Sequence, residues 1–129
     1  MWRRPRDGKS RATADPDWLS NVTTPNHPEY PAAHGCASSA VTHALEAFFG
    51  TDDIPFTVDS AAVGVVQPVH SYARFSDALE EVKRARVYGG MHYRNSTEQG
   101  AKLGKKVAAH LRRHFFNESQ GRDDEGDDD

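Results

Sequence analysis

Three stretches of the chain carry apolar residues at helical spacing, and glycines or prolines separate them. The first stretch shows the i, i+3, i+4, i+7 pattern of one helix face in Ala37, Ala40, Val41, Ala44, Leu45 and Phe48. The same reasoning predicts helices over about 35–49, 71–87 and 96–116. Strand-forming runs are scarce, and within the connection 51–70 only IPFTV is expected to be briefly extended. We therefore predict an all-α fold with about three main helices.

Both ends of the chain are polar and charged, and the apolar residues gather between them. The start, MWRRPRDGKSR, is rich in arginine and lysine, whereas the end, DDEGDDD, holds acids and one glycine. Segments of that composition bury too little apolar surface to fold. We predict a basic irregular arm over 1–24, a helical domain over 25–117 and an acidic disordered tail over 118–129. The basic stretch MWRRPRDGKSR has no aromatic residue between its charges beyond Trp2, which argues against a nucleic-acid partner.

The remaining composition limits redox chemistry and location. Cys36 is the single cysteine, so it forms no intramolecular disulfide, and we interpret it as a small packing residue. No apolar run reaches the length of a signal peptide or a membrane span. The chain as given is therefore expected to be cytoplasmic.

His34 lies between an extended segment and a helix. In HPEYPAAHGCASSA, Pro28 and Pro31 forbid helix, and small apolar residues at helical spacing begin near Gly35. Such a position holds a side chain rigidly beside the free N–H groups of a helix start, which favour an anion.

A second unusual stretch, RARVYGGMHYRNSTEQG, holds Arg86 at the end of the second predicted helix and His92 before the third. Because Gly89 and Gly90 interrupt the helix between Arg86 and His92, both side chains can converge on one pocket from two helix ends. A guanidinium suits an oxyanion, and an imidazole can attack phosphorus, bind a metal centre or transfer protons. The same residues also fit a structural reading, in which the histidines cap carbonyls and Arg86 pairs with Glu80 or Glu81.

These two segments resemble motifs of the type 2 phosphatidic acid phosphatase superfamily and, within it, of the vanadium-dependent haloperoxidases. The residues Pro31-Ala32-Ala33-His34 stand in the slots of Pro-Ser-Gly-His, and Arg86 and His92 stand in those of Ser-Arg-x(5)-His-x(3)-Asp. The similarity covers about Trp18 to Phe116. It implies the C-terminal part of a larger helical bundle, whose preceding helices are expected to be missing.

The resemblance also implies roles. His92 would be the vanadate ligand of a haloperoxidase or the phosphate-attacking nucleophile of a phosphatase, Arg86 would bind the oxyanion oxygens, and His34 would be the acid–base group. Vanadate would be the cofactor of a haloperoxidase, and a phosphatase would need none. The substrates would be peroxide with a halide, or a phosphoester.

The chain departs from the family pattern at several positions. Ala32, Ala33 and Ala85 replace motif residues, and Ser96 stands where the aspartate belongs. Arg4, which Pro5 follows, is the expected cofactor-binding residue of the first motif, although no lysine can lie seven residues before it. We therefore expect the chain alone to be weakly active or inactive.

Two other classes of function fit the sequence. The chain could be a non-catalytic helical remnant that acts as a binding or assembly module, completed by the missing helices or by a second copy. It could also be an interaction protein with a basic arm. His110 and His114 have the i, i+4 spacing of zinc ligands, but no third ligand lies near them in the sequence, so we expect them to face solvent.

Overall fold

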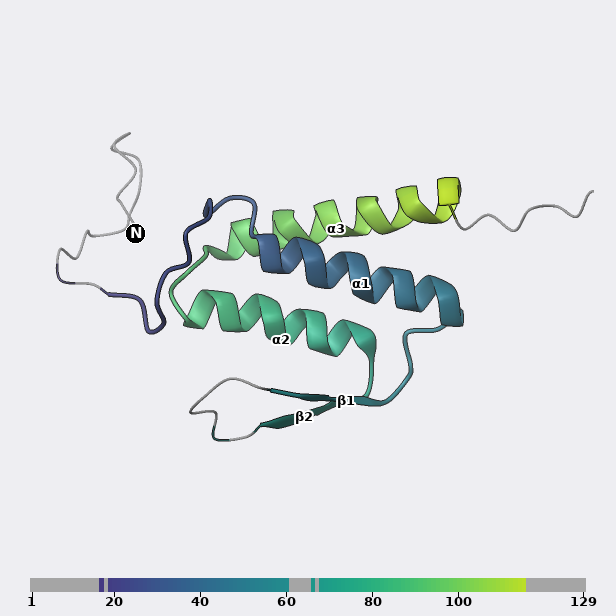
Figure 1. Ribbon diagram of the computed structural model, residues 1–129, viewed down its shortest axis with the longest axis horizontal. Coiled ribbons are helices and arrows are strands. Elements are labelled where there is room, and N and C mark those ends of the chain that lie inside the picture. Colours follow the sequence, from purple (N-terminus) through teal and green to yellow (C-terminus); the bar gives the residue numbers. More distant parts are fainter. Residues whose placement is uncertain (1–16, 18, 61–65, 67, 116–129) are drawn as a thin grey trace, which may run out of the picture.

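The structure is a computed structural model that describes residues 17, 19–60, 66 and 68–115. In that part of the chain the elements are α1 (Ala33–Phe49), β1 (Phe56–Asp59), β2 (Val69–Tyr72), α2 (Phe75–Tyr88) and α3 (Arg94–Phe115). Figure 1 shows α1 and α3 running side by side in the same direction, with α2 on the other side of α1 and the hairpin beyond α2. The predicted, mainly helical fold with three main helices is confirmed.

The small antiparallel hairpin departs from the all-α prediction. Phe56 pairs with Tyr72 at one end of the two strands. Residues 71–74, predicted as the start of the second helix, lie in β2 and the bend after it. The ring of Phe56 contacts Phe75 at 5.5 Å and Tyr72 at 5.2 Å between centroids. These long-range aromatic contacts hold the hairpin against α2, and local helical periodicity does not reveal them.

The start of α2 is capped from a distant loop. The residue before it, Arg74, gives no side-chain cap. Instead the Asp52 carboxylate accepts hydrogen bonds from the Ser76 N–H at 2.9 Å and from the Ser76 hydroxyl, while its carbonyl accepts from Phe75 N at 3.2 Å. An acid at this place satisfies free N–H groups and complements the helix dipole.

The parallel helices α1 and α3 touch backbone to backbone. A Cβ added at Gly100 would lie 2.3 Å from the Ala32 carbonyl oxygen, and one at Gly104 would lie 2.1 Å from that of Cys36. Ser39 of α1 is buried in this contact and donates a 2.7 Å hydrogen bond to the Ala101 carbonyl. Glycine is required here because no side chain fits between the two backbones.

The larger apolar side chains of α1 and α3 do not fill this contact. The stripe on α3 stays exposed, with Leu103 43%, Val107 40% and Phe115 70% accessible. On α1, Val41 is 58% and Phe48 is 82% exposed. The described part of the chain therefore presents two apolar helix faces that are not covered by its own residues.

The predicted arm and tail are described only in part. Residues 19–24 form neither helix nor strand. Residues 1–16 and 18 of the arm, with Arg4 among them, lie outside the described residues, as do the tail 118–129 and the last residue of the third predicted helix. The domain boundaries therefore stay a prediction. None of the described helices combines the length and apolarity that crossing a bilayer requires.

Candidate functional site

His92 is held in the turn between α2 and α3, and its side chain is almost fully buried. Its Nδ1 lies 2.7 Å from the carbonyl oxygen of Glu29, in the segment before α1. A carbonyl oxygen only accepts hydrogen bonds, so Nδ1 carries the proton and donates it. In the neutral ring the other nitrogen, Nε2, then keeps its lone pair, as a metal ligand or a nucleophile requires.

Arg86, in the last turn of α2, lies beside this lone pair. Its Nη2 is 3.4 Å from the Nε2 of His92. The turn is closed by the N–H groups of Met91 and His92, which donate to the Arg86 carbonyl at 3.1 and 3.2 Å. Gly90 adopts a left-handed φ of 76°, which glycine accommodates without strain. The glycine break therefore brings Arg86 and His92 together, as their positions in the sequence predicted.

Arg86 keeps a spare donor. Its Nε is buried and has no hydrogen-bond partner among the described residues. The acids proposed as alternative partners are engaged elsewhere, because Glu80 pairs with Lys83 and Glu81 with His70. The guanidinium can therefore present unused N–H groups to a ligand.

His34 lies in the first turn of α1, near the other two residues, and its side chain is exposed. The ring of His27 contacts both histidines: its centroid is 6.1 Å from that of His34 and 5.7 Å from that of His92, and it stacks on His92 at an interplanar angle of 13°. The Nε2 of His27 is buried without a partner among the described residues. Sequence reasoning missed His27, although it belongs to the same proline-rich stretch as His34.

The local electrostatics favour neutral histidines beside a charged arginine. Burial lowers the pKa of His92, and the charge of Arg86 lowers it further, although the bond to the Glu29 carbonyl opposes both. Loss of surrounding water also lowers the pKa of His34, again with help from Arg86. Burial lowers the pKa of Arg86 as well, but guanidinium groups stay charged in proteins. Neutral imidazoles are the form that binds a metal centre or accepts a proton.

The departures from the family motifs have structural counterparts. Ser96 is buried, and its carbonyl accepts a 3.1 Å hydrogen bond from Ala32 N. A main-chain hydrogen bond therefore joins the two motif segments, the one with Ala32 and the one with Ser96. Ala32 itself, in the slot of the motif serine, offers no hydroxyl to a ligand. Cys36 is half-buried, and its N–H takes part in the first turn of α1.

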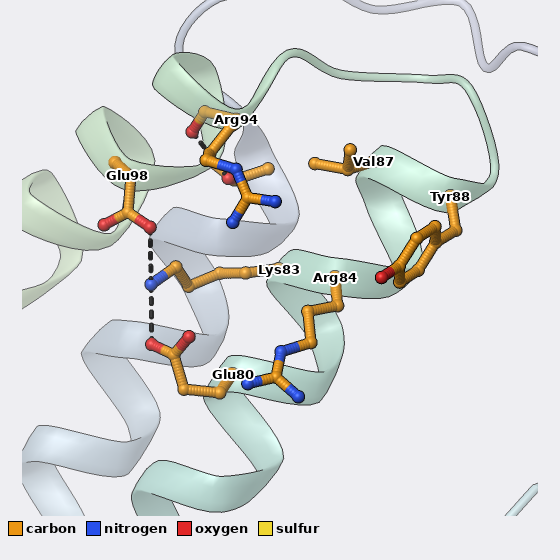
Figure 2. A pocket seen from close by; sticks show the side chains of 8 residues that line it. Glu80, Lys83, Arg84, Val87, Tyr88, Arg94 and Glu98 are labelled. Carbon is orange, nitrogen blue, oxygen red and sulfur yellow. Dashed lines mark hydrogen bonds and ion pairs between the residues drawn. The ribbon is translucent and has the colours of Figure 1, made fainter.

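A second polar cluster lies between α2 and α3. Figure 2 shows Lys83 reaching between Glu80 and Glu98, with Nζ–O distances of 2.6 and 2.8 Å. Burial alone would lower the pKa of Lys83, but the two glutamates raise it. The adjacent pocket has a volume of ≈20 Å³, room for about one water molecule. The cluster therefore joins the two helices and leaves no space for a substrate.

The predicted zinc spacing on α3 gains no support from the geometry of the described residues. His110 and His114 contact each other on α3, with ring centroids 4.3 Å apart. Across the described ranges, no three His, Cys, Asp or Glu side chains gather as a metal site would require. The candidate site is therefore the group around Arg86 and His92.

A family model described as the VCPO second helical-bundle domain matches residues 1–121. The chain belongs to this family. A bacterial vanadium-dependent iodoperoxidase of known structure is similar to this VCPO-type domain, with 33% identity and a TM-score of 0.66 over 74% of the chain. The holo and apo structures of a bacterial vanadium-dependent chloroperoxidase share its fold, with 22% identity and TM-scores of 0.61 and 0.60. No curated protein sequence shows significant similarity to the chain.

The VCPO-type domain corresponds to only part of these larger proteins. It spans 23% of the iodoperoxidase and 24% and 23% of the two chloroperoxidase chains. The haloperoxidase-like fold and the C-terminal-type helical bundle expected from the motifs are thus confirmed.

Proposed function

We propose that this chain supplies one part of a vanadate-binding haloperoxidase site, in which Arg86 and His92 hold the oxyanion and His34 transfers protons. One observation carries the proposal: Nδ1 of His92 is engaged by the Glu29 carbonyl, while Nε2 faces the Arg86 guanidinium at 3.4 Å. This arrangement places a lone pair and a fixed positive charge side by side, which suits the binding of a tetrahedral oxyanion.

The residues present fit vanadate as a group. Among the described residues, Arg86 Nε is a charged donor without a hydrogen-bond partner, and the Nε2 atom of His27, whose ring stacks on that of His92, also has none. When bound, vanadate supplies a Lewis-acidic centre at which peroxide is activated for halide oxidation. The chain's own part is to bind the oxyanion through Arg86 and His92, and to hold the His92 ring in one tautomer.

His34 is the proton-transfer group of this proposal. Its ring contacts that of His27, which also stacks on His92, and its lowered pKa keeps the imidazole neutral near pH 7. A neutral ring can accept a proton from a bound acid such as peroxide. Arg4, the third residue expected to contact the cofactor, lies outside the described residues and keeps that role as a prediction.

The exposed apolar stripes of α1 and α3 are the surface against which the rest of such a bundle packs. The occupant is a helical-bundle portion like the larger share of the iodoperoxidase that this chain does not match, since the chain spans 23% of it. Exposed stripes of this kind, carrying Val41, Phe48 and Leu103, mark protein contact surfaces. The same portion would supply the donors that the chain lacks.

Activity of the chain alone should be weak. Ala32 and Ala33 provide no hydroxyl to the oxyanion, and one missing donor of this kind typically costs about 2.7–4 kcal/mol of transition-state stabilisation. Binding should persist where turnover fails, because Arg86 and His92 are already in place. A chain that binds no oxyanion would instead be a structural remnant.

The test is oxyanion binding to the purified chain. Orthovanadate and inorganic phosphate should each raise the midpoint of thermal unfolding, because a ligand of the folded state alone adds stability. His92→Ala should abolish the shift, while His110→Ala, on the exposed side of α3, should leave it intact. Bromide oxidation with vanadate and peroxide and hydrolysis of a chromogenic phosphomonoester then distinguish the haloperoxidase from the phosphatase. Equal shifts in both variants would refute the site.

A further inference from the structure

We propose that Glu29 is the positioning residue of His92, and that its carboxylate takes the place of the aspartate that Ser96 replaces. The inference rests on the proposed function, because it assigns a second layer of residues to the same site. The motif aspartate would stand in the first turn of α3, where this chain has Ser96. The Glu29 carboxylate comes instead from the segment before α1.

Glu29 touches the His92 region with both its main chain and its side chain. Its carbonyl accepts the Nδ1 proton of His92 at 2.7 Å. Its Oε1 accepts the N–H of the next residue, Tyr93, at 2.9 Å, and lies 3.8 Å from the same Nδ1. One residue therefore holds the ring, the backbone beside the ring and a negative charge close to the ring proton.

Ser96 cannot do this. A serine hydroxyl carries no charge, and the contribution that the structure shows from Ser96 is a carbonyl that accepts from Ala32 N at 3.1 Å. That bond has a consequence for Glu29, because Ala32 lies three residues after it. The segment from Glu29 to Ala32 is fastened at both ends to the segment from His92 to Ser96, so the Glu29 carbonyl stays in register with Nδ1.

The burial of the two side chains allows the Glu29 carboxylate to act on the His92 ring. The His92 side chain is 1% exposed and the Glu29 side chain is 37% exposed. The carboxylate therefore reaches a buried ring from the surface while keeping part of its own hydration, so it avoids the full cost of burying a charge. Its charge favours positive charge that develops on the ring when Nε2 shares its lone pair with an oxyanion centre. Partners that orient a ligating histidine in this way typically change ligand affinity about 10–100-fold when they are removed.

The experiment uses the full chain and three variants: Glu29→Ala, Glu29→Gln and Glu46→Gln. Glutamine keeps an oxygen acceptor for the Tyr93 N–H but removes the charge. Glu46 is the matched control, because its carboxylate also contacts a histidine Nδ1, that of His43, at 2.8 Å on α1. Circular dichroism establishes that each variant retains its helices.

The first measurement needs no oxyanion. Nuclear magnetic resonance should show a slowly exchanging Nδ1 proton of His92 and a protected Tyr93 amide in the unaltered chain, in Glu29→Gln and in Glu46→Gln. Both signals should be lost in Glu29→Ala, whose carbonyl is no longer anchored by the side chain. Unchanged signals in a folded Glu29→Ala variant would overturn the positioning role.

The second measurement is the dissociation constant for orthovanadate, by calorimetry. We expect it to rise about 10–100-fold in Glu29→Ala and about tenfold in Glu29→Gln, and to stay constant in Glu46→Gln. A Glu29→Gln variant that binds as tightly as the unaltered chain would overturn the role of the charge. If the unaltered chain binds no oxyanion, the proposed function fails, and the ring-proton measurement still decides whether Glu29 positions His92.

Discussion

At the scale of single residues, the site combines neutral rings with a fixed positive charge. The lowered pKa values of His34 and His92 have the same first cause, the loss of water around the rings, and Arg86 adds to both. In the proposed function, the two histidines would therefore need to lose no proton before an anion binds. The lowered pKa values also make the stability of the fold depend on pH.

We predict that the free energy of unfolding falls as the pH drops below about 6.5, the ordinary pKa of histidine. Because both pKa values are lowered by folding, the unfolded chain binds protons first, so the stabilisation is complete above that range and is lost below it. Urea titrations at pH 8 and pH 5 measure the difference. His92→Gln should reduce it and His110→Gln should not, and an undiminished difference in His92→Gln would contradict the assignment.

The residue contacts show what sequence reasoning could reach. Arg86 and His92 are six positions apart, and a glycine break between two helices was enough to predict that they meet. Glu29 and His27 escaped notice because their contacts with His92 and Tyr93 span more than sixty positions. Only the packing of the segment before α1 against α3 brings them together, and no local pattern reports it.

At the scale of elements, the contact between α1 and α3 depends on glycine. We predict that Gly100→Ala lowers the free energy of unfolding by roughly 1–3 kcal/mol, although alanine is the better helix former. The added methyl would meet the Ala32 carbonyl oxygen at 2.3 Å, and a backbone cannot change rotamer to avoid it. Chemical denaturation measures the change.

The matched control for this prediction is Lys102→Ala, two positions further along α3 on an exposed side chain. It should change the free energy of unfolding by less than about 0.5 kcal/mol, as is usual for surface substitutions. A Gly100→Ala variant as stable as this control would show that the two helices can move apart.

The cap of α2 gives a second prediction at this scale. Asp52→Ala should lower the free energy of unfolding by about 0.5–2 kcal/mol, because the Ser76 N–H loses its acceptor. The neighbouring Asp53→Ala removes only an exposed ion pair with Arg74 and should cost much less. Thermal or urea unfolding of the two variants provides the comparison, and equal losses would argue against the cap.

The cap of α2 also explains why the sequence pattern predicted the start of this helix too early. Periodicity extended the second helix back to Ser71, but the capping residue lies in the loop after α1, and the intervening residues pair with β1. The three helices themselves were predictable, with ends that differ by a few residues from the structure. The start of α2 and the presence of the hairpin depend on distant capping and strand pairing, which local periodicity does not report.

At the scale of the whole molecule, the small core and the exposed stripes predict how the chain behaves in solution. Among the described residues, the buried apolar side chains are those of Ala32, Phe75, Leu79 and Ala108. We predict that the chain alone binds a hydrophobic dye and associates at high concentration. The double variant Val41→Ser and Val107→Ser should reduce both effects with little loss of stability, because each valine is at least 40% exposed.

Fluorescence titration and light scattering measure these two effects. The matched control is Leu79→Ser, which removes a buried apolar side chain of α2 and should destabilise the fold instead. Dye binding that the double variant leaves unchanged would place the exposed apolar surface elsewhere. Amphipathic spacing predicted that the helices have apolar faces, but not which of those faces the chain itself covers.

The backbone contact between α1 and α3 also bears on how such a chain can change over generations. His34 lies in the first turn of the helix that Gly100 and Gly104 hold in place, and His92 lies just before the partner helix. Their separation is therefore set by main-chain atoms, which most substitutions leave untouched. Side chains at positions such as Ala33 and Ser96 can therefore change while the main-chain contact between the two helices stays the same. A single substitution at either position would then change the groups around the site without any new arrangement of helices.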